Sequence, residues 1–153
     1  MITVFTDGSS VQGNPGLAGG AYVLLRDGKI IESLGVPIGR ATNNAGELVA
    51  ALCGLRAADT HVMDGEEVVI VSDSRYVISS LYKLGEIRKD DSRPNIKVLR
   101  ELSSVVNSIL DKGCRVHTKW VKGHGRNSGN KMVDRLARTA ARSQEYQYVM
   151  EKQ

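Results

Sequence analysis

Four carboxylates lie where the chain is predicted to leave a strand or enter a helix: Asp7, Glu47, Asp73 and Asp134. Asp7 ends the apolar segment 2–6, and Asp73 closely follows the apolar run 68–71. A charge at the end of a buried strand is costly unless it is neutralised. If the two strands are neighbours, both carboxylates emerge at one sheet edge, where repulsion raises their pKa values unless cations intervene. Mg²⁺ takes oxygen ligands of this kind, and two such ions about 3.5–4 Å apart can stabilise both oxygens of a phosphoryl displacement.

Each of these acids also has a purely structural interpretation. Asp7 can hydrogen-bond within the turn that follows it, and Glu47 can complete a capping box with Asn44. Asp73 can cap a helix, and Asp134 can favour a helix N-terminus through the macrodipole. These roles together leave unexplained why two acids end the two most apolar strands.

His124 lies within the glycine-rich segment 122–130, KGHGRNSGN. Its imidazole can carry a proton near neutral pH, which makes it a candidate for proton transfer. The structural alternative is a surface histidine in a loop. His61 and His117 lack such a context, and we expect both to be structural.

Apolar patterning along the chain predicts a mixed α/β fold. The expected order is three strands, a helix, a strand, two helices, a strand and a last helix, with strands at 2–6, 21–25, 30–36, 68–71 and 115–121. Asp27-Gly28 predicts a hairpin turn between the second and third strands, so the first three strands are expected to be antiparallel. Sites in such folds gather at the C-terminal ends of strands.

Composition sets broad limits on the function. A chain of 153 residues fits one domain. Its net charge of +4 favours an anionic partner, either nucleic acid or an acidic membrane surface. No apolar run reaches membrane-spanning length, the N-terminus lacks secretory-signal features, and the two cysteines, Cys53 and Cys114, form no CxxC pair. We therefore expect a cytoplasmic protein with free thiols.

Six segments resemble type 1 ribonuclease H in order and spacing: FTDGS, NPG, TNNAGEL, SDSRYV, WVKGHG and NKMVDRLA. The resemblance implies the ribonuclease H-like fold, a five-stranded mixed sheet of order 3-2-1-4-5 flanked by helices. It assigns residues 1–142 to the domain and leaves 143–153 as a polar, loosely ordered tail. The implied activity is endonucleolytic cleavage of the RNA strand of RNA–DNA hybrids, leaving 3′-hydroxyl and 5′-phosphate ends. The resemblance implies no membrane and no protein partner, and we expect a monomer.

The same resemblance assigns roles to individual residues. It implies that Asp7, Glu47, Asp73 and Asp134 bind two Mg²⁺ ions, for which Mn²⁺ is also suited, and that His124 assists proton transfer or product release. The 2′-hydroxyl in the minor groove distinguishes RNA from DNA. The residues implied to bind substrate are Asn14, Asn43 and Asn44 at this hydroxyl, Thr42 and Asn95 at a DNA phosphate, and Ser74 near the scissile region.

The sequence departs from the family pattern at three places. The segment 85–95 is short where many bacterial members carry a basic protrusion with tryptophans, which leaves Tyr82 as a candidate for stacking on the substrate. Lys131 stands where glutamate is common, and Gly46 where a larger residue is common. A basic cluster around the second and third helices is expected to follow the nucleic-acid backbone, although Asp90 and Asp91 dilute it; its members are Arg75, Arg88, Lys89, Arg93 and Lys97.

Two other functions are compatible with such a fold. One is a different nuclease, such as a resolvase or exonuclease, which the matches at TNN and GNPG disfavour. The other is a binding module that has lost catalysis, which the presence of all four acids disfavours.

Overall fold

The computed structural model describes residues 1–123 and 127–151, without the side chains of 145–151. The strands and helices follow the predicted order, and one short 3₁₀ helix is added to it. The elements are β1 (Ile2–Val11), β2 (Gly16–Arg26), β3 (Lys29–Ala41), α1 (Asn43–His61), β4 (Glu67–Ser72), α2 (Arg75–Tyr82), η1 (Leu84–Glu86), α3 (Ile96–Asp111), β5 (Arg115–Trp120) and α4 (Ser128–Glu151). Within these described ranges, no helix is long and apolar enough to cross a membrane.

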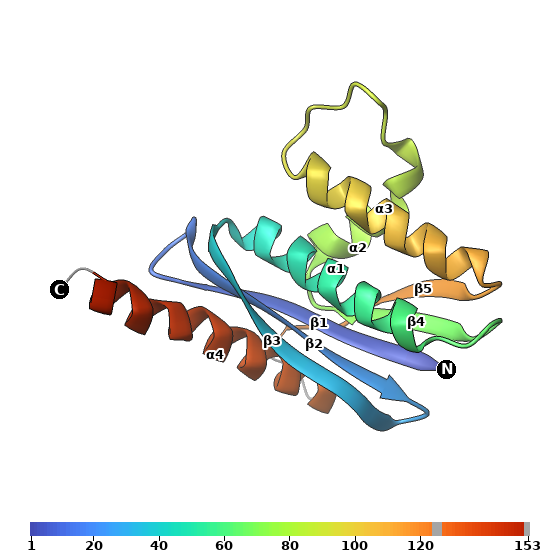
Figure 1. Cartoon of the computed structure of the whole chain (residues 1–153), viewed down its shortest axis with the longest axis horizontal. Helices are drawn as coiled ribbons and strands as arrows, with labels where there is room; N and C mark the ends of the chain where they lie inside the picture. The colour runs from blue at the N-terminus through green and yellow to red at the C-terminus, as the bar shows by residue number, and fades with distance from the viewer. Residues whose placement is uncertain (124–126, 152–153) are drawn as a thin grey trace.

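The five strands form one mixed sheet of order β3-β2-β1-β4-β5 (Figure 1). β1 pairs with β2 and β2 with β3 in antiparallel fashion, whereas β4 runs parallel to both β1 and β5. This topology confirms the predicted fold class and strand order. It also places β1 and β4 side by side in parallel, so their C-terminal ends point the same way.

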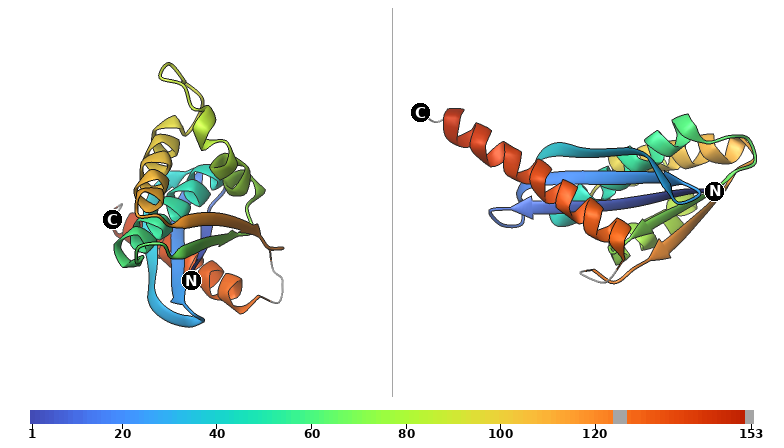
Figure 2. Two further views of the ribbon diagram at one scale, coloured as in Figure 1. Left: turned by 90° about the vertical axis from the view of Figure 1, so that its right-hand side faces the viewer. Right: turned by 90° about the horizontal axis from the view of Figure 1, so that it is seen from below.

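Helices cover the two faces of the sheet unequally. α1, α2 and α3 lie on one face and α4 lies alone on the other, as both views in Figure 2 show. The larger core includes apolar side chains of β1, β4, α1 and α3, with Leu48, Leu55, Ile70 and Leu102 fully buried. A smaller core joins β2 to α4 through Val23 and Val133.

β1 is longer than the sequence predicted, and Asp7 lies inside it instead of at its end. The strand pairs with β4 only as far as Phe5, opposite Val71. Its pairing with β2 continues to Val11. Asp7 therefore follows closely the point at which β1 and β4 part, where one side of β1 is no longer covered by a neighbouring strand.

Glycines explain why a segment that resembles a loop is a strand. Two helices approach the sheet so closely that a side chain at these glycine positions would not fit. A Cβ on Gly8 would lie 2.8 Å from the backbone nitrogen of Glu47 in α1, and one on Gly19 would collide with the backbone of Ala137 in α4. Small residues thus allow helices to pack directly against the strand backbones, and the pairing of β1 with β2 continues between them.

The last helix also differs from the expectation for the C-terminal segment. α4 continues to Glu151, so residues 143–151 are helical where a loose tail was expected. The side chain of Gln144 donates a hydrogen bond to the carbonyl of Ala18 (2.6 Å) and accepts one from the backbone N–H of Gly39 (2.7 Å). This residue therefore ties α4 to both β2 and β3.

Replacing each of two glycines of α1 by alanine should change the free energy of unfolding in opposite directions. Alanine favours a helix over glycine by up to about 1 kcal/mol. A Cβ on Gly46 would meet only the Cβ of Ala18, at 3.7 Å, so Gly46→Ala should raise the free energy of unfolding by about 0.5–1 kcal/mol. A Cβ on Gly54 would lie 2.8 Å from side-chain carbons of Val4 and Thr6, so Gly54→Ala should lower it. Urea unfolding of both variants measures this; a loss of stability in Gly46→Ala would contradict the packing described.

Candidate active site

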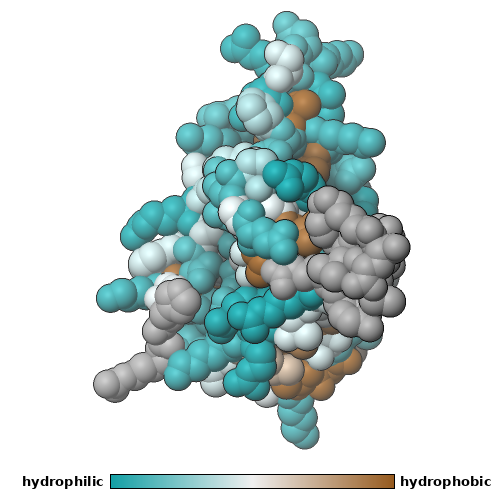
Figure 3. Space-filling model, turned by 90° about the vertical axis from the view of Figure 1, so that its left-hand side faces the viewer, coloured by the Kyte–Doolittle hydropathy of each residue, from teal (hydrophilic) through white to brown (hydrophobic). Residues whose placement is uncertain are grey.

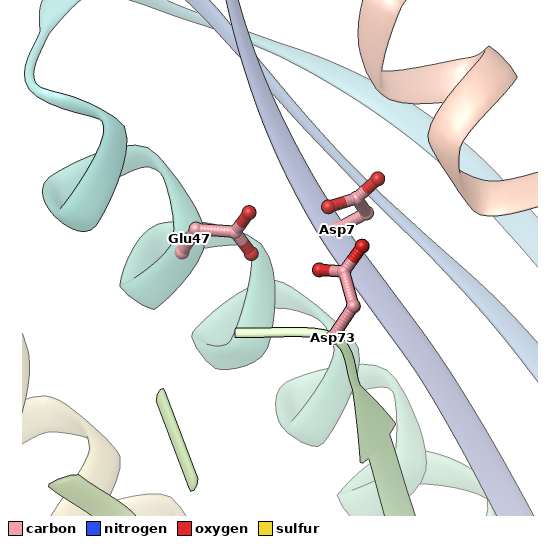
Figure 4. Close-up of side chains that lie close together, drawn as sticks. All are labelled: Asp7, Glu47 and Asp73. Carbon is pink, nitrogen blue, oxygen red and sulfur yellow. The ribbon is translucent and has the colours of Figure 1, made fainter. Parts of the chain in front are cut away.

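Three carboxylates converge where β1 and β4 part. Asp7 comes from β1, Glu47 from α1, and Asp73 from the segment directly after β4, and their side chains point toward one another (Figure 4). One oxygen of each lies within 4.8 Å of the others. The structure therefore brings together three of the four acids that the sequence singled out.

Neighbouring residues perform the capping roles that Glu47 and Asp73 were considered for. The side chain of Thr42 accepts a hydrogen bond from the N–H of Ala45 and caps α1 (3.1 Å). The side chain of Ser74 caps α2 by accepting from the N–H of Val77 (3.1 Å). Capping of these two helices therefore does not depend on Glu47 or Asp73.

Burial and neighbouring acids raise the pKa values of Asp7 and Glu47. Asp7 is 3 % exposed, and burial, followed by the charges of Glu47 and Asp73, raises its pKa to about 10. Burial also raises the pKa of Glu47 to about 7, although hydrogen bonding with Asp7 acts in the opposite direction. The group therefore carries fewer negative charges at neutral pH than three isolated carboxylates would.

The cluster has the chemistry of a divalent cation site. Oε2 of Glu47 is buried and has no hydrogen-bond partner among the described residues, and a buried oxygen of this kind requires an explanation. Hard cations such as Mg²⁺ prefer carboxylate oxygens. The convergence of three carboxylates, the partnerless oxygen and the raised pKa values all fit a site for such ions.

Asp134 stands beside this group on α4. It contributes to the raised pKa of Asp7 through hydrogen bonding, and it pairs with Arg138 one helical turn away (2.5 Å). Asp134 and Asp73 face the same cavity of about 310 Å³, which is also lined by Asn130, Lys131, Arg135 and Arg138. The fourth predicted acid thus lies at the edge of the cluster, paired with an arginine.

The predicted histidine lies outside the described residues. His124 belongs to the segment 124–126, so its role stays a prediction. The residue before it, Gly123, lies against Asp73, where an added Cβ would sit 3.0 Å from Oδ2.

Five of the six predicted substrate-binding residues line one groove of about 650 Å³. These residues are Asn14, Thr42, Asn43, Asn44 and Asn95, joined by Tyr76, Arg93 and Pro94. Ser74 is not among the lining residues and instead caps α2. The molecular face that carries the β1–β2 loop and the starts of α1 and α3 is mostly hydrophilic, as Figure 3 shows.

Hydrogen bonds hold the groove together. Oδ1 of Asn14 accepts from the backbone N–H of Asn43 (2.9 Å), and the hydroxyl of Ser10 donates to Oδ1 of Asn43 (2.5 Å). On the opposite wall, Nδ2 of Asn95 donates to the hydroxyl of Tyr76 (3.1 Å). Sequence reasoning assigned no role to Tyr76; its position three residues after Asp73, at the start of a helix, was the available signal.

Comparisons with known proteins agree with this architecture. The family model for RNase H matches residues 1–142. The ribonuclease H of Photorhabdus luminescens is 34 % identical, covering 94 % of this chain and 90 % of that protein. Among solved structures, the N-terminal RNase H domain of a Mycobacterium tuberculosis protein, fused to maltose-binding protein, has a TM-score of 0.78 at 25 % identity, covering 96 % of this chain and 97 % of that chain. LC11-RNase H1, solved with an RNA/DNA hybrid, shares the fold with a TM-score of 0.70 at 21 % identity, covering 94 % and 98 %.

Without metal, the protein should lose stability as pH rises. The raised pKa of Asp7 means that the folded state keeps a proton that the unfolded chain releases above about pH 4. Stability from this group is complete below that pH and is lost as pH rises toward the folded value near 10. Melting temperatures in EDTA should therefore fall between about pH 5 and pH 9, and Asp7→Asn should flatten the fall.

Excess Mg²⁺ should reverse this loss. An ion at about 100 times its Kd stabilises the folded state by about 2.7 kcal/mol, and the gain should be larger at about pH 9 than at pH 5 because protons compete with the ion. The same melting series with Mg²⁺ measures it, with Asp7→Asn as the control. An unchanged melting temperature at the higher pH would contradict a metal site here.

Proposed function

Because the chain belongs to the ribonuclease H family, we propose that it cleaves the RNA strand of RNA–DNA hybrids by two-metal-ion hydrolysis. The observation that carries this proposal is the meeting of Asp7, Glu47 and Asp73 within 4.8 Å at the point where β1 and β4 part. The chain is a hydrolase of the ribonuclease H kind, and a protein of the same fold, LC11-RNase H1, has been solved with an RNA/DNA hybrid.

The metal ions would be held by the carboxylates of Asp7, Glu47, Asp73 and Asp134. Mg²⁺ suits these oxygen ligands, and Mn²⁺ shares the preference. When bound, a pair of such ions supplies an activated water and stabilises negative charge on the attacking and leaving oxygens. Two of these acids, Asp7 and Glu47, would lose the protons that their raised pKa values favour in the metal-free protein.

Cleavage of the RNA strand requires a bond to break and a proton to move. Attack of water on the phosphorus with departure of the 3′-oxygen leaves 3′-hydroxyl and 5′-phosphate ends. His124 is proposed to move a proton or to assist product release, since an imidazole titrates near neutral pH.

Selectivity for RNA would come from the groove lined by Asn14, Asn43 and Asn44. The wide minor groove of a hybrid displays 2′-hydroxyls, which donate and accept hydrogen bonds. Asparagine amides can do both. Thr42 and Asn95 in the same groove are proposed to hold a phosphate of the DNA strand.

Neither rival function has support of this kind. A binding module without catalysis has no need for partly protonated, buried acids beside an oxygen that lacks a partner. The asparagines that line the groove suit a 2′-hydroxyl, which favours hybrid recognition over cleavage of DNA by a resolvase or exonuclease. A monomeric state and a cytoplasmic location are part of the proposal, as is a ribonuclease H domain that includes residues 1–142.

Asp73→Asn should reduce cleavage at least about 100-fold without unfolding the protein. Loss of one preorganised electrostatic group reduces rates by about 10²–10³-fold or more. Because the charge of Asp73 contributes to the raised pKa of Asp7, its removal should raise the melting temperature of the metal-free protein. Cleavage of an end-labelled hybrid with Mg²⁺ and a melting curve in EDTA test both effects. The exposed acid Asp64 provides the control, Asp64→Asn, which should cleave normally; residual activity in Asp73→Asn close to that of this control would contradict the proposed mechanism.

Asn44→Ala should weaken recognition of the hybrid. The side chain of Asn44 is exposed in the first turn of α1, so the loss should change folding little. A hydrogen bond is worth about 0.5–1.5 kcal/mol, which predicts a rise in KM of about 2- to 10-fold. Steady-state cleavage measures it, with Asn107→Ala on the exposed side of α3 as the matched control. Equal KM values for the two variants would remove Asn44 from the substrate site.

A further inference from the structure

A third cavity lies beside the acidic cluster, on a face of α2. It has a volume of about 360 Å³ and is lined by Arg75, Ile78, Ser79, Tyr82 and Trp120. The first four occur at intervals of three and four residues, so they share one side of the helix, and Trp120 is the last residue of β5. The groove described above lies elsewhere, since its residue from α2 is Tyr76.

The cavity contains two exposed aromatic side chains and a guanidinium. Tyr82 is 76 % exposed and Trp120 is 39 % exposed. The guanidinium of Arg75 lies over the indole ring of Trp120, 4.0 Å from its centroid, in a cation–π contact. Covering the indole explains why Arg75 lies there, but it does not explain why Tyr82 is left open to water on the same cavity.

Trp120 connects this cavity to the catalytic edge. Its indole N–H donates a hydrogen bond to the backbone carbonyl of Asp73 (3.0 Å). Arg75 follows Asp73 by two residues at the start of α2. A nucleic acid whose phosphate reaches the acidic cluster therefore passes close to the cavity.

We propose that this cavity binds an unpaired nucleotide next to the hybrid, with its base stacked against Arg75 and Tyr82. Bases within a duplex are stacked on one another and offer only their edges. Single-stranded bases expose their faces, which stack on aromatic rings and on arginine planes. The positive charge of Arg75 also complements the phosphate backbone. The inference rests on the proposed function and adds a substrate class, hybrids that border a single-stranded segment.

The sequence provides a direct reporter, because Trp120 is the single tryptophan of the chain. In EDTA, where cleavage does not proceed, the protein is titrated with a blunt hybrid and with four extended versions of it. Each extended version carries a few unpaired nucleotides at one of the four strand ends. At least one extension should change Trp120 fluorescence beyond the effect of the blunt hybrid. The same extension should tighten binding by about 5- to 150-fold, the range for one stacked base.

Two substitutions separate stacking from charge. Tyr82→Ala should remove most of the gain from the extension, and Arg75→Lys should reduce it because lysine keeps the charge but lacks the planar group. Leu110→Ala, at another exposed apolar side chain on α3, is the matched control and should keep the whole gain.

Equal fluorescence and affinity for blunt and extended hybrids would overturn the inference, as would a full gain in both Tyr82→Ala and Arg75→Lys. Cleavage of the blunt hybrid by the unmodified protein with Mg²⁺ tests the proposed function separately. Failure of that reaction is therefore distinguishable from failure of the nucleotide site.

Discussion

The close approach of three carboxylates, one of them buried and two half-buried, is the constraint around which this molecule is built. Burial of Asp7, followed by the charges of Glu47 and Asp73, raises the pKa of Asp7, so bringing these groups together opposes folding in the metal-free protein at neutral pH. The fold nevertheless holds them in place. Parallel pairing of β1 with β4 fixes two of the acids at the point where the strands part, and α1, packed on β1, holds the third. The apolar cores on the two faces of the sheet must supply the stability that this arrangement opposes.

The close approach of helices to strands makes this precision possible. At Gly8 the backbone of β1 nearly touches the backbone of Glu47, so the carboxylate of α1 reaches the sheet without a long, mobile connection. At Gly19 the other face of the sheet meets α4 in the same way. Residues of α1 and α4 are thereby held against two adjacent strands from opposite sides, with little freedom to shift relative to each other.

The sequence predicted the element order, the strand order and three members of the acidic cluster, because apolar periodicity and the family motifs both bear on these features. It placed the end of β1 too early, since glycine and serine after Asp7 are typical of loops, and only the packed helices show why they extend a strand here. The pairing of Asp134 with Arg138 depends on side-chain geometry that spacing alone does not determine. Tyr76 had a visible position in a matched motif but no chemical signal of its own, and its place in the groove depends on how α2 meets the loop before α3.

The side chain of Gln144 lies beyond the end of the family model and still takes part in the fold. The match to the family model ends at residue 142. The backbone groups of Ala18 and Gly39 nevertheless find hydrogen-bond partners two residues later. A chain cut at the end of the shared pattern would retain every acidic ligand and still leave a carbonyl and an amide of neighbouring strands to be satisfied by water. Residues beyond the end of the family model therefore take part in the fold, and one glutamine joins the sheet to its last helix.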